Sequence, residues 1–101
     1  MAKFACFVEV TVKPGIGAKY IETLRSYGKE ILSEEPGCIR FDVMPAIERD
    51  GTAIPDLAII NEVYADRTAY LTHGKSPRLP KLLETTAPMT ISVKSRYAAL
   101  E

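Results

Sequence analysis

Residues 57–66 read LAIINEVYAD, and this stretch decides the fold of the chain. Its apolar and β-branched residues predict a strand at 57–65. Asp66 follows as a good N-cap for a short helix at 67–73, and Gly74 is placed to end that helix. The stretch therefore predicts a strand that leads directly into a helix.

The sequence on either side of this stretch predicts three more strands and two more helical segments. Alternating apolar and polar residues indicate strands at 3–13, 38–45 and 89–98, and helical spacing indicates helices at 16–35 and from Ser76 onward, with Pro77 at the first helical position. The polar segment 48–56 is expected to project as a loop. The resulting order is β-α-β-β-α-β, which predicts an α+β, ferredoxin-like single domain over residues 1–101 with a four-stranded antiparallel sheet and helices on one face.

Apolar residues on both faces of the predicted sheet indicate a homodimer. Ile59 and Ile60 point in opposite directions, as do Cys6 and Phe7. The helices can cover only one face, and exposure of the other costs about 25 cal/mol per Å² of apolar surface. We therefore expect a second copy of the chain to cover it, so that the two sheets face each other.

The composition is that of an ordinary globular domain, with 101 residues, 47% hydrophobic residues, 26% charged residues and a formal net charge of zero. No basic stripe indicates binding to nucleic acid. The N-terminal residues show no secretory signal, and no apolar run reaches the roughly 20 residues needed to cross a bilayer, so a cytoplasmic protein without a membrane partner is expected. Cys6 and Cys38 are expected to be reduced, buried thiols, and the spacing of cysteine and histidine predicts no metal site.

Acid–base chemistry in this chain is expected near His73, the only histidine. It follows Ala69 and Tyr70 on one helix face, where an imidazole can act as an acid or a base near neutral pH. The alternative is a histidine that caps the carbonyl groups at the helix end or bonds to a loop. Tyr64 ends its strand, where it can donate a hydrogen bond to a substrate oxygen or simply pack as an aromatic wall.

Glu62 lies in the middle of a strand among apolar neighbours, where a carboxylate needs a partner or solvent. We expect a structural ion pair with Arg40. Aromatic and thioether side chains are expected to form the core or to line a cavity: Phe4, Phe7, Phe41, Met44, Tyr70 and Met89. No phosphate-binding loop, dinucleotide fingerprint or G-x-S-x-G motif is present.

Taken together, residues 35–43 (EPGCIRFDV) and 61–66 (NEVYAD), followed by Ala69-Tyr70, His73 and Ser76-Pro77, resemble the antibiotic-biosynthesis monooxygenase family. The match extends over nearly the whole chain in order and length. The resemblance implies ferredoxin-like subunits that pair through their sheets into a dimeric α/β barrel.

The resemblance also implies a function, because the family includes monooxygenases that oxidise phenolic or quinol rings with dioxygen and without a metal or flavin. The protein then supplies deprotonation, orientation and a dry pocket. By resemblance this chain is a cofactor-free oxidoreductase that acts on a small aromatic molecule, with His73 as the proton-transfer residue and Tyr64 orienting the substrate oxygen. Phe41, Glu62, Tyr70 and Arg78 are expected to line the pocket.

The chain also departs from the family pattern. Arg78 stands where many members carry a second histidine, so it could bind an anionic substrate or be exposed. The absence of tryptophan disfavours haem degradation. An isomerase or a small-ligand-binding protein on the same dimeric fold, and a non-catalytic structural dimer with a filled core, remain as alternatives. An apolar cavity beside His73 would distinguish the first two from the third.

Overall fold

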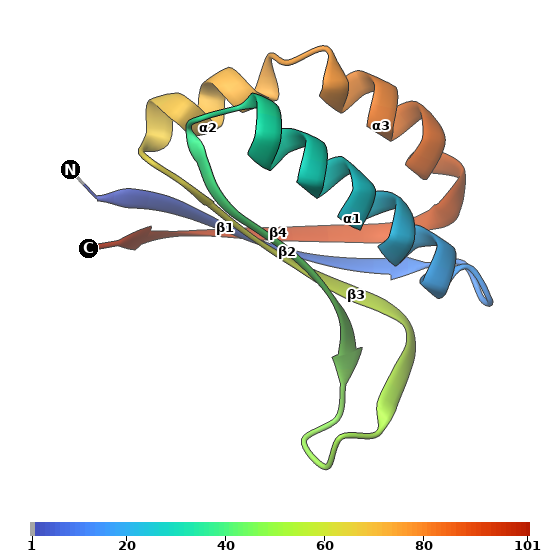
Figure 1. The fold of residues 1–101 in the computed structure, drawn as a ribbon. Coiled ribbons are helices and arrows are strands. Elements are labelled where there is room, and N and C mark those ends of the chain that lie inside the picture. Colours follow the sequence, from blue (N-terminus) through green and yellow to red (C-terminus); the bar gives the residue numbers. More distant parts are fainter. Residues whose placement is uncertain (1) are drawn as a thin grey trace.

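The computed structural model describes residues 2–101 and shows one sheet with all of its helices on the same side (Figure 1). The elements in chain order are β1 (Lys3–Val12), α1 (Gly17–Glu34), β2 (Cys38–Ile47), β3 (Ala53–Tyr64), α2 (Arg67–Gly74), α3 (Arg78–Thr86), a short 3₁₀ turn (Ala87–Met89) and β4 (Thr90–Leu100). The four strands are antiparallel in the order β2-β3-β1-β4. The predicted ferredoxin-like arrangement is confirmed, and the second helical segment consists of two helices, α2 and α3.

The core lies between the sheet and the helices. The strands contribute Val10 and Val12 from β1 and Ile60 and Tyr64 from β3, all of which are almost fully buried. These side chains alternate along their strands, as the period of two requires for one buried face. The helix-covered face of the sheet therefore holds the main apolar core.

Helix α1 packs on the sheet through a stripe that differs partly from the predicted one. Helical spacing in the sequence predicts a stripe of Ile21, Leu24, Gly28, Ile31 and Leu32, with Gly28 packed closely against a strand. The structure buries Tyr20, Leu24, Tyr27, Gly28 and Ile31. The expectation that Leu32 is buried was wrong. The buried face of the helix is rotated so that two tyrosines point to the sheet, and Leu32 stays 43% exposed. Two phenol groups thus enter the interior from this helix.

Gly28 lies in the middle of that stripe because Phe41 leaves no room for a side chain. A Cβ atom at Gly28 would lie 2.5 Å from Cδ1 of Phe41. The predicted close packing of this glycine against a strand is confirmed. It brings α1 close to β2 and fixes the position of the Phe41 ring.

Strands β2 and β3 continue beyond the body of the sheet as a long hairpin (Figure 1). The predicted loop at 48–56 is confirmed at the polar turn of residues 48–52 and was wrong for residues 53–56, because β3 already begins at Ala53. Asp56 has φ of 59°, and its carboxylate accepts hydrogen bonds from the backbone N–H groups of Gly15 and Gly17. The hairpin is thereby fastened to the start of α1.

The other face of the sheet has no helix on it and carries exposed apolar side chains, including Phe7, Met44 and Ile59. Phe7 and Met44 therefore belong neither to the core nor to a cavity under the helices, because strand alternation turns them away from that side. Asn61 lies on the same open face, and its Oδ1 atom is buried without a hydrogen-bond partner. This face is the surface on which a second copy is expected.

Both cysteines, Cys6 and Cys38, are free and buried. Within residues 2–101, no helix is both long enough and apolar enough to span a bilayer.

Candidate acid–base site beneath the helices

The position of His73 follows from the way α2 begins. The Asp66 side chain caps the helix by accepting a hydrogen bond of 2.8 Å from the N–H of Ala69. Because β3 ends at Tyr64, this cap holds α2 close to the end of the strand, and His73 falls in its last turn. The imidazole is only 6% exposed and faces the interior.

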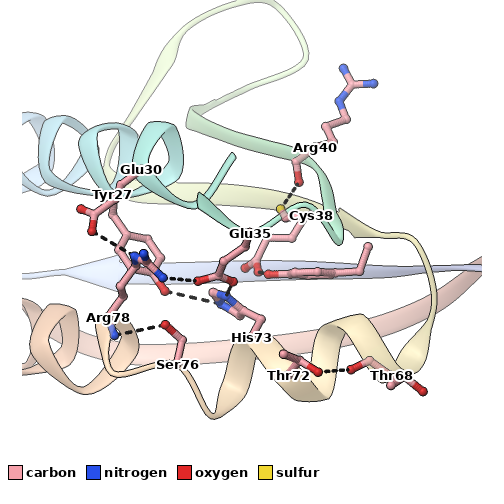
Figure 2. Close-up of polar contacts among 12 residues, drawn as sticks. Tyr27, Glu30, Glu35, Cys38, Arg40, Thr68, Thr72, His73, Ser76 and Arg78 are labelled. Carbon is pink, nitrogen blue, oxygen red and sulfur yellow. Dashed lines mark hydrogen bonds and ion pairs between the residues drawn. The ribbon is translucent and has the colours of Figure 1, made fainter. Parts of the chain in front are cut away.

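Two side chains from the α1 region hold the imidazole ring (Figure 2). The Nδ1 atom of His73 lies 2.7 Å from Oε1 of Glu35, and the Nε2 atom lies 3.4 Å from the hydroxyl of Tyr27. In the neutral form, a proton on Nδ1 that is donated to Glu35 leaves Nε2 as an acceptor that faces the hydroxyl of Tyr27. The ring therefore does not cap the end of its own helix; it bonds to a residue in the connection after α1, which is the second form of the alternative given for this histidine.

Arg78 supports this arrangement from the outer side (Figure 2). Its guanidinium lies 3.4 Å from Oε2 of Glu35 and also contacts Glu30 at 3.1 Å and Glu34 at 3.7 Å. Glu35 thus bridges Arg78 and His73 through its two oxygen atoms. Arg78 lines neither cavity beside His73, and its charge is directed at these three carboxylates.

Glu62 and Tyr64 form a second hydrogen-bonded pair in the interior. The hydroxyl of Tyr64 donates to Oε1 of Glu62 at 2.6 Å, and the Tyr64 side chain is fully buried. The predicted ion pair of Glu62 with Arg40 was wrong. A register shift between Cys38 and Arg40 places Arg40 opposite Val63, and Arg40 pairs with Asp42 instead.

Burial raises the pKa of each acidic group in this interior. For Glu62 the main cause is desolvation, which the Tyr64 hydrogen bond and the charge of His73 oppose. Burial and then the charge of Glu62 raise the pKa of Tyr64, and burial and then the charge of Glu35 raise the pKa of Tyr27. The two phenols consequently stay protonated, and Glu62 retains its proton to a higher pH than an exposed glutamate.

Two cavities open beside His73. One of about 250 Å³ lies beneath α1 and α3, and one of about 410 Å³ lies toward α2 and β4. Four residues line both of them: Val8, Glu62, His73 and Leu79. The first cavity is also lined by Tyr27, Phe41 and Leu82, and the second by Cys6, Tyr70 and Tyr97. The imidazole of His73 therefore borders empty space on the helix-covered side of the sheet.

A larger groove of about 720 Å³ lies between α1 and the β2–β3 hairpin, but it contains no buried acid–base group. Cavity size alone would favour this groove. Buried titratable groups with specific partners are the better indication of chemistry. We therefore place the candidate site at His73.

The structure brings most of the predicted site residues together. His73, Glu62, Phe41 and Tyr70 line the cavities, whereas Tyr64 lies behind Glu62 with its ring centre 5.3 Å from that of His73. Sequence reasoning missed Tyr27 and Glu35. Tyr27 directly precedes Gly28, and Glu35 directly precedes Pro36, but neither position carries a local pattern that points to a histidine 38 or more residues away.

No group of three or more histidine, cysteine, aspartate or glutamate side chains in the part of the chain that the structure describes could hold a metal ion.

Comparisons with known proteins agree with the fold and with the order of the motifs. A sequence model of the family described as antibiotic biosynthesis monooxygenase matches residues 4–83. A search of curated proteins finds no match.

Among solved structures, a protein from Nitrosomonas europaea, provisionally described as an antibiotic biosynthesis monooxygenase, is 20% identical with a TM-score of 0.81 over 96% of this chain and 88% of its own. A protein from Bacteroides thetaiotaomicron with the same provisional description is 23% identical with a TM-score of 0.77 over 95% of this chain and 87% of its own. A conserved protein from Methanosarcina mazei Go1 is 18% identical with a TM-score of 0.81 over 100% of this chain and 95% of its own. At these identities the structures establish the shared fold.

Proposed function

Because the chain belongs to the antibiotic biosynthesis monooxygenase family, we propose that it is a cofactor-independent monooxygenase that oxidises a small phenol or quinol with dioxygen. The observation that carries the proposal is the buried imidazole of His73, which faces two cavities while Glu35 holds its Nδ1 atom. An imidazole held in this way can accept a phenolic proton through Nε2.

The residues of the site supply the conditions that such a reaction needs. Glu35 fixes the tautomer of His73 and stabilises the imidazolium that forms when the ring takes a proton. The phenolate left in the cavity is rich in electrons and can reduce dioxygen. One phenol and one dioxygen then give one quinone and one water, so the substrate itself supplies all of the electrons.

The cavity favours a small and largely apolar molecule. Ligand pockets usually measure about 300–1,000 Å³, and the cavity beneath α1 and α3, at about 250 Å³, falls just below this range. Its walls include Phe41, Leu79 and Leu82, which exclude water and can pack on an aromatic ring. A compound with one or two rings fits these conditions better than a larger polycycle.

The functional unit we propose is a homodimer in which a second copy covers the open face of the sheet. Phe7, Met44 and Ile59 are exposed on that face of a single chain, and burying them supplies a driving force for pairing. The unpaired Oδ1 atom of Asn61 on the same face calls for a donor that a partner can bring. Both observations support the dimer.

The test is oxygen consumption with a panel of hydroquinones and phenols, comparing the wild-type protein with His73→Ala. We expect the variant to lose about 100-fold in kcat, because a positioned acid–base group contributes roughly 10²–10⁴-fold. Thr72→Ala is the matched control, since Thr72 precedes His73 on α2 but is exposed, and its side-chain hydroxyl donates to the carbonyl of Thr68. The control should keep full activity.

Two outcomes would count against the proposal. An unchanged rate in His73→Ala would remove the imidazole from the mechanism. No oxygen consumption with any compound of the panel would refute the monooxygenase function and would leave an isomerase or a ligand-binding protein on the same cavity.

A further inference from the structure

Glu62 is a buried carboxyl group without a cationic partner. Its residue is only 9% exposed, and within residues 2–101 its side chain makes one hydrogen bond, which it accepts from the hydroxyl of Tyr64. An ionised carboxylate in such a place normally needs a cation or several donors. Glu62 lies opposite Phe41 of β2, and the cation next to Phe41 in the sequence is Arg40. Arg40 lies on the opposite face of the sheet, where it pairs with Asp42. Glu62 is therefore suited to hold a proton rather than a charge.

Glu62 faces the same two cavities as His73, from a different element. Glu62 comes from β3 and His73 from α2, and both line the cavity of about 250 Å³ and the cavity of about 410 Å³. His73 bonds to the carboxylate of Glu35, whereas the hydrogen bond that Glu62 accepts comes from the neutral phenol of Tyr64. Active sites often pair two titratable groups whose environments differ in this way, one as the base and the other as the acid.

The other groups around Glu62 do not change this balance. Those that face it from the packed elements are Cys6 of β1, Tyr20 and Tyr27 of α1, Cys38 of β2, Tyr64 of β3, Tyr70 and His73 of α2, Lys75 after α2, and Tyr97 of β4, with Glu35 and Arg78 beyond the imidazole. Thiols and phenols predominate, and burial keeps the pKa of Cys6 at about 12 and that of Cys38 at about 11. Lys75 is exposed at the rim of the second cavity. The surroundings are thus uncharged except at His73 and the rim.

We infer that Glu62 is the proton donor of this site, giving its proton to an oxygen atom of the bound molecule while His73 accepts one. The inference rests on the monooxygenase function proposed above. It extends that function by naming the residue that acts as the acid. The substrate must place an ionisable hydroxyl at His73, and the oxygen that the ring gains from dioxygen must then lie at Glu62.

The proton and electron balance of the reaction closes with these two residues. His73 takes the phenolic proton, and the phenolate passes electrons to dioxygen in two one-electron steps, so that a ring carbon forms a bond to oxygen and a peroxide anion results. Glu62 protonates the outer peroxide oxygen. The oxygen–oxygen bond then breaks as Glu62 takes back the proton of the same ring carbon, and the hydroxide released receives the proton from His73. The products are a quinone and water, and both residues return to their starting state.

The protonation state of Glu62 can be measured without any turnover, by infrared spectroscopy of the carboxyl C=O stretch at pH 7. We expect a band of a protonated carboxyl group in the wild-type protein that is absent in Glu62→Gln. Binding of 4-nitrophenol, a phenol that resists oxidation, should shift the band because the carboxyl group then donates to the probe. Tyr64→Phe is a second variant, in which loss of the only hydrogen-bond partner should shift the band to higher frequency. Absence of the band, or a band that ignores both the probe and Tyr64→Phe, would overturn the inference.

Kinetics give the second readout. Glu62→Gln should lower kcat for oxygen consumption by about 100-fold with little change in KM, because glutamine keeps the size and the acceptor atom but cannot give a proton. A kcat within twofold of wild type would overturn the role of Glu62 as the acid. If the wild-type protein consumes no oxygen with any phenol, the proposed function fails, and the infrared response to 4-nitrophenol still decides whether Glu62 donates its proton to an oxygen atom of a bound molecule.

Discussion

The two faces of the sheet carry polar side chains in very different settings. On the helix-covered face, Glu62 and His73 are buried, Glu62 with a hydrogen bond from Tyr64 and His73 with a bond to Glu35. On the open face, Arg40 pairs with its near neighbour Asp42, and both remain partly exposed beside apolar side chains. The comparison teaches that the first face encloses cavities beside buried acid–base groups, whereas the second leaves apolar and charged side chains exposed in the single chain.

The largest expected effect is on the open face, with Phe7→Glu. In a two-fold symmetric interface each substitution occurs twice, and a buried aromatic anchor typically contributes about 2 kcal/mol, so the dimer dissociation constant should rise about a thousandfold. Sedimentation velocity over a range of concentrations measures this. Leu32→Glu is the matched control, because Leu32 has the same 43% exposure as Phe7 but lies on α1, on the other side of the sheet. A wild-type protein that sediments as a monomer would remove the proposed role of the open face.

The second effect concerns packing on the helix-covered face, with Gly28→Ala. The new Cβ atom would meet Phe41 at 2.5 Å, and overpacking of this kind costs about 1–3 kcal/mol, against about 1 kcal/mol gained from helix propensity. We expect a net loss of about 1 kcal/mol in the free energy of unfolding, measured by urea denaturation. Gly74→Ala is the control, since no atom lies within 4 Å of its added Cβ. Equal stability of the two variants would show that the Phe41 ring moves aside freely.

The sequence was sufficient for the elements because their signals are local. Strand alternation, the Asp66 cap and the glycine in the α1 stripe each depend on neighbours within a few residues, and the structure confirms all three. The candidate site could be predicted only in part. The bond of His73 to Glu35 joins residues 38 apart, and its contact with Tyr27 joins residues 46 apart, so no local periodicity contains them.

The wrong partner for Glu62 has a similar origin. Counting residues along β2 assumes an unbroken alternation, and the register shift after Cys38 moves Arg40 to the open face. A single irregularity in one strand thereby decides whether a buried carboxyl group is paired with a cation or left to hold a proton. Sequence patterns do not reveal such an irregularity, although they place the strand correctly.

The third effect tests how far the acid–base character of the helix-covered face depends on Glu35. In Glu35→Gln the amide oxygen can still accept the hydrogen bond from His73 Nδ1, but the negative charge that stabilises the imidazolium is lost. The difference between a charge-assisted and a neutral hydrogen bond is about 1.4 kcal/mol, so kcat should fall about tenfold. Glu34→Gln is the control, because Glu34 is exposed and its one ion pair within residues 2–101 is with Arg78, at 3.7 Å. A similar loss in both variants would assign the effect to the overall charge near Arg78 rather than to the bond with His73.

The smallest effect is a difference in the pH dependence of stability, and it again separates the two faces. Because burial raises the pKa of Glu62 in the folded state, the folded protein binds this proton more tightly than the unfolded chain does. Its contribution to stability is therefore fully present below the ordinary glutamate pKa of about 4.3 and is lost as the pH rises through the folded value. Glu62→Gln removes this dependence, so the free energy of unfolding of the variant relative to wild type should increase from pH 4 upward and then level off. Urea denaturation at a series of pH values measures the difference. A constant difference across the series would mean that Glu62 ionises alike in the folded and unfolded states, and the distinction between a protonated interior and a charged outer face would not hold.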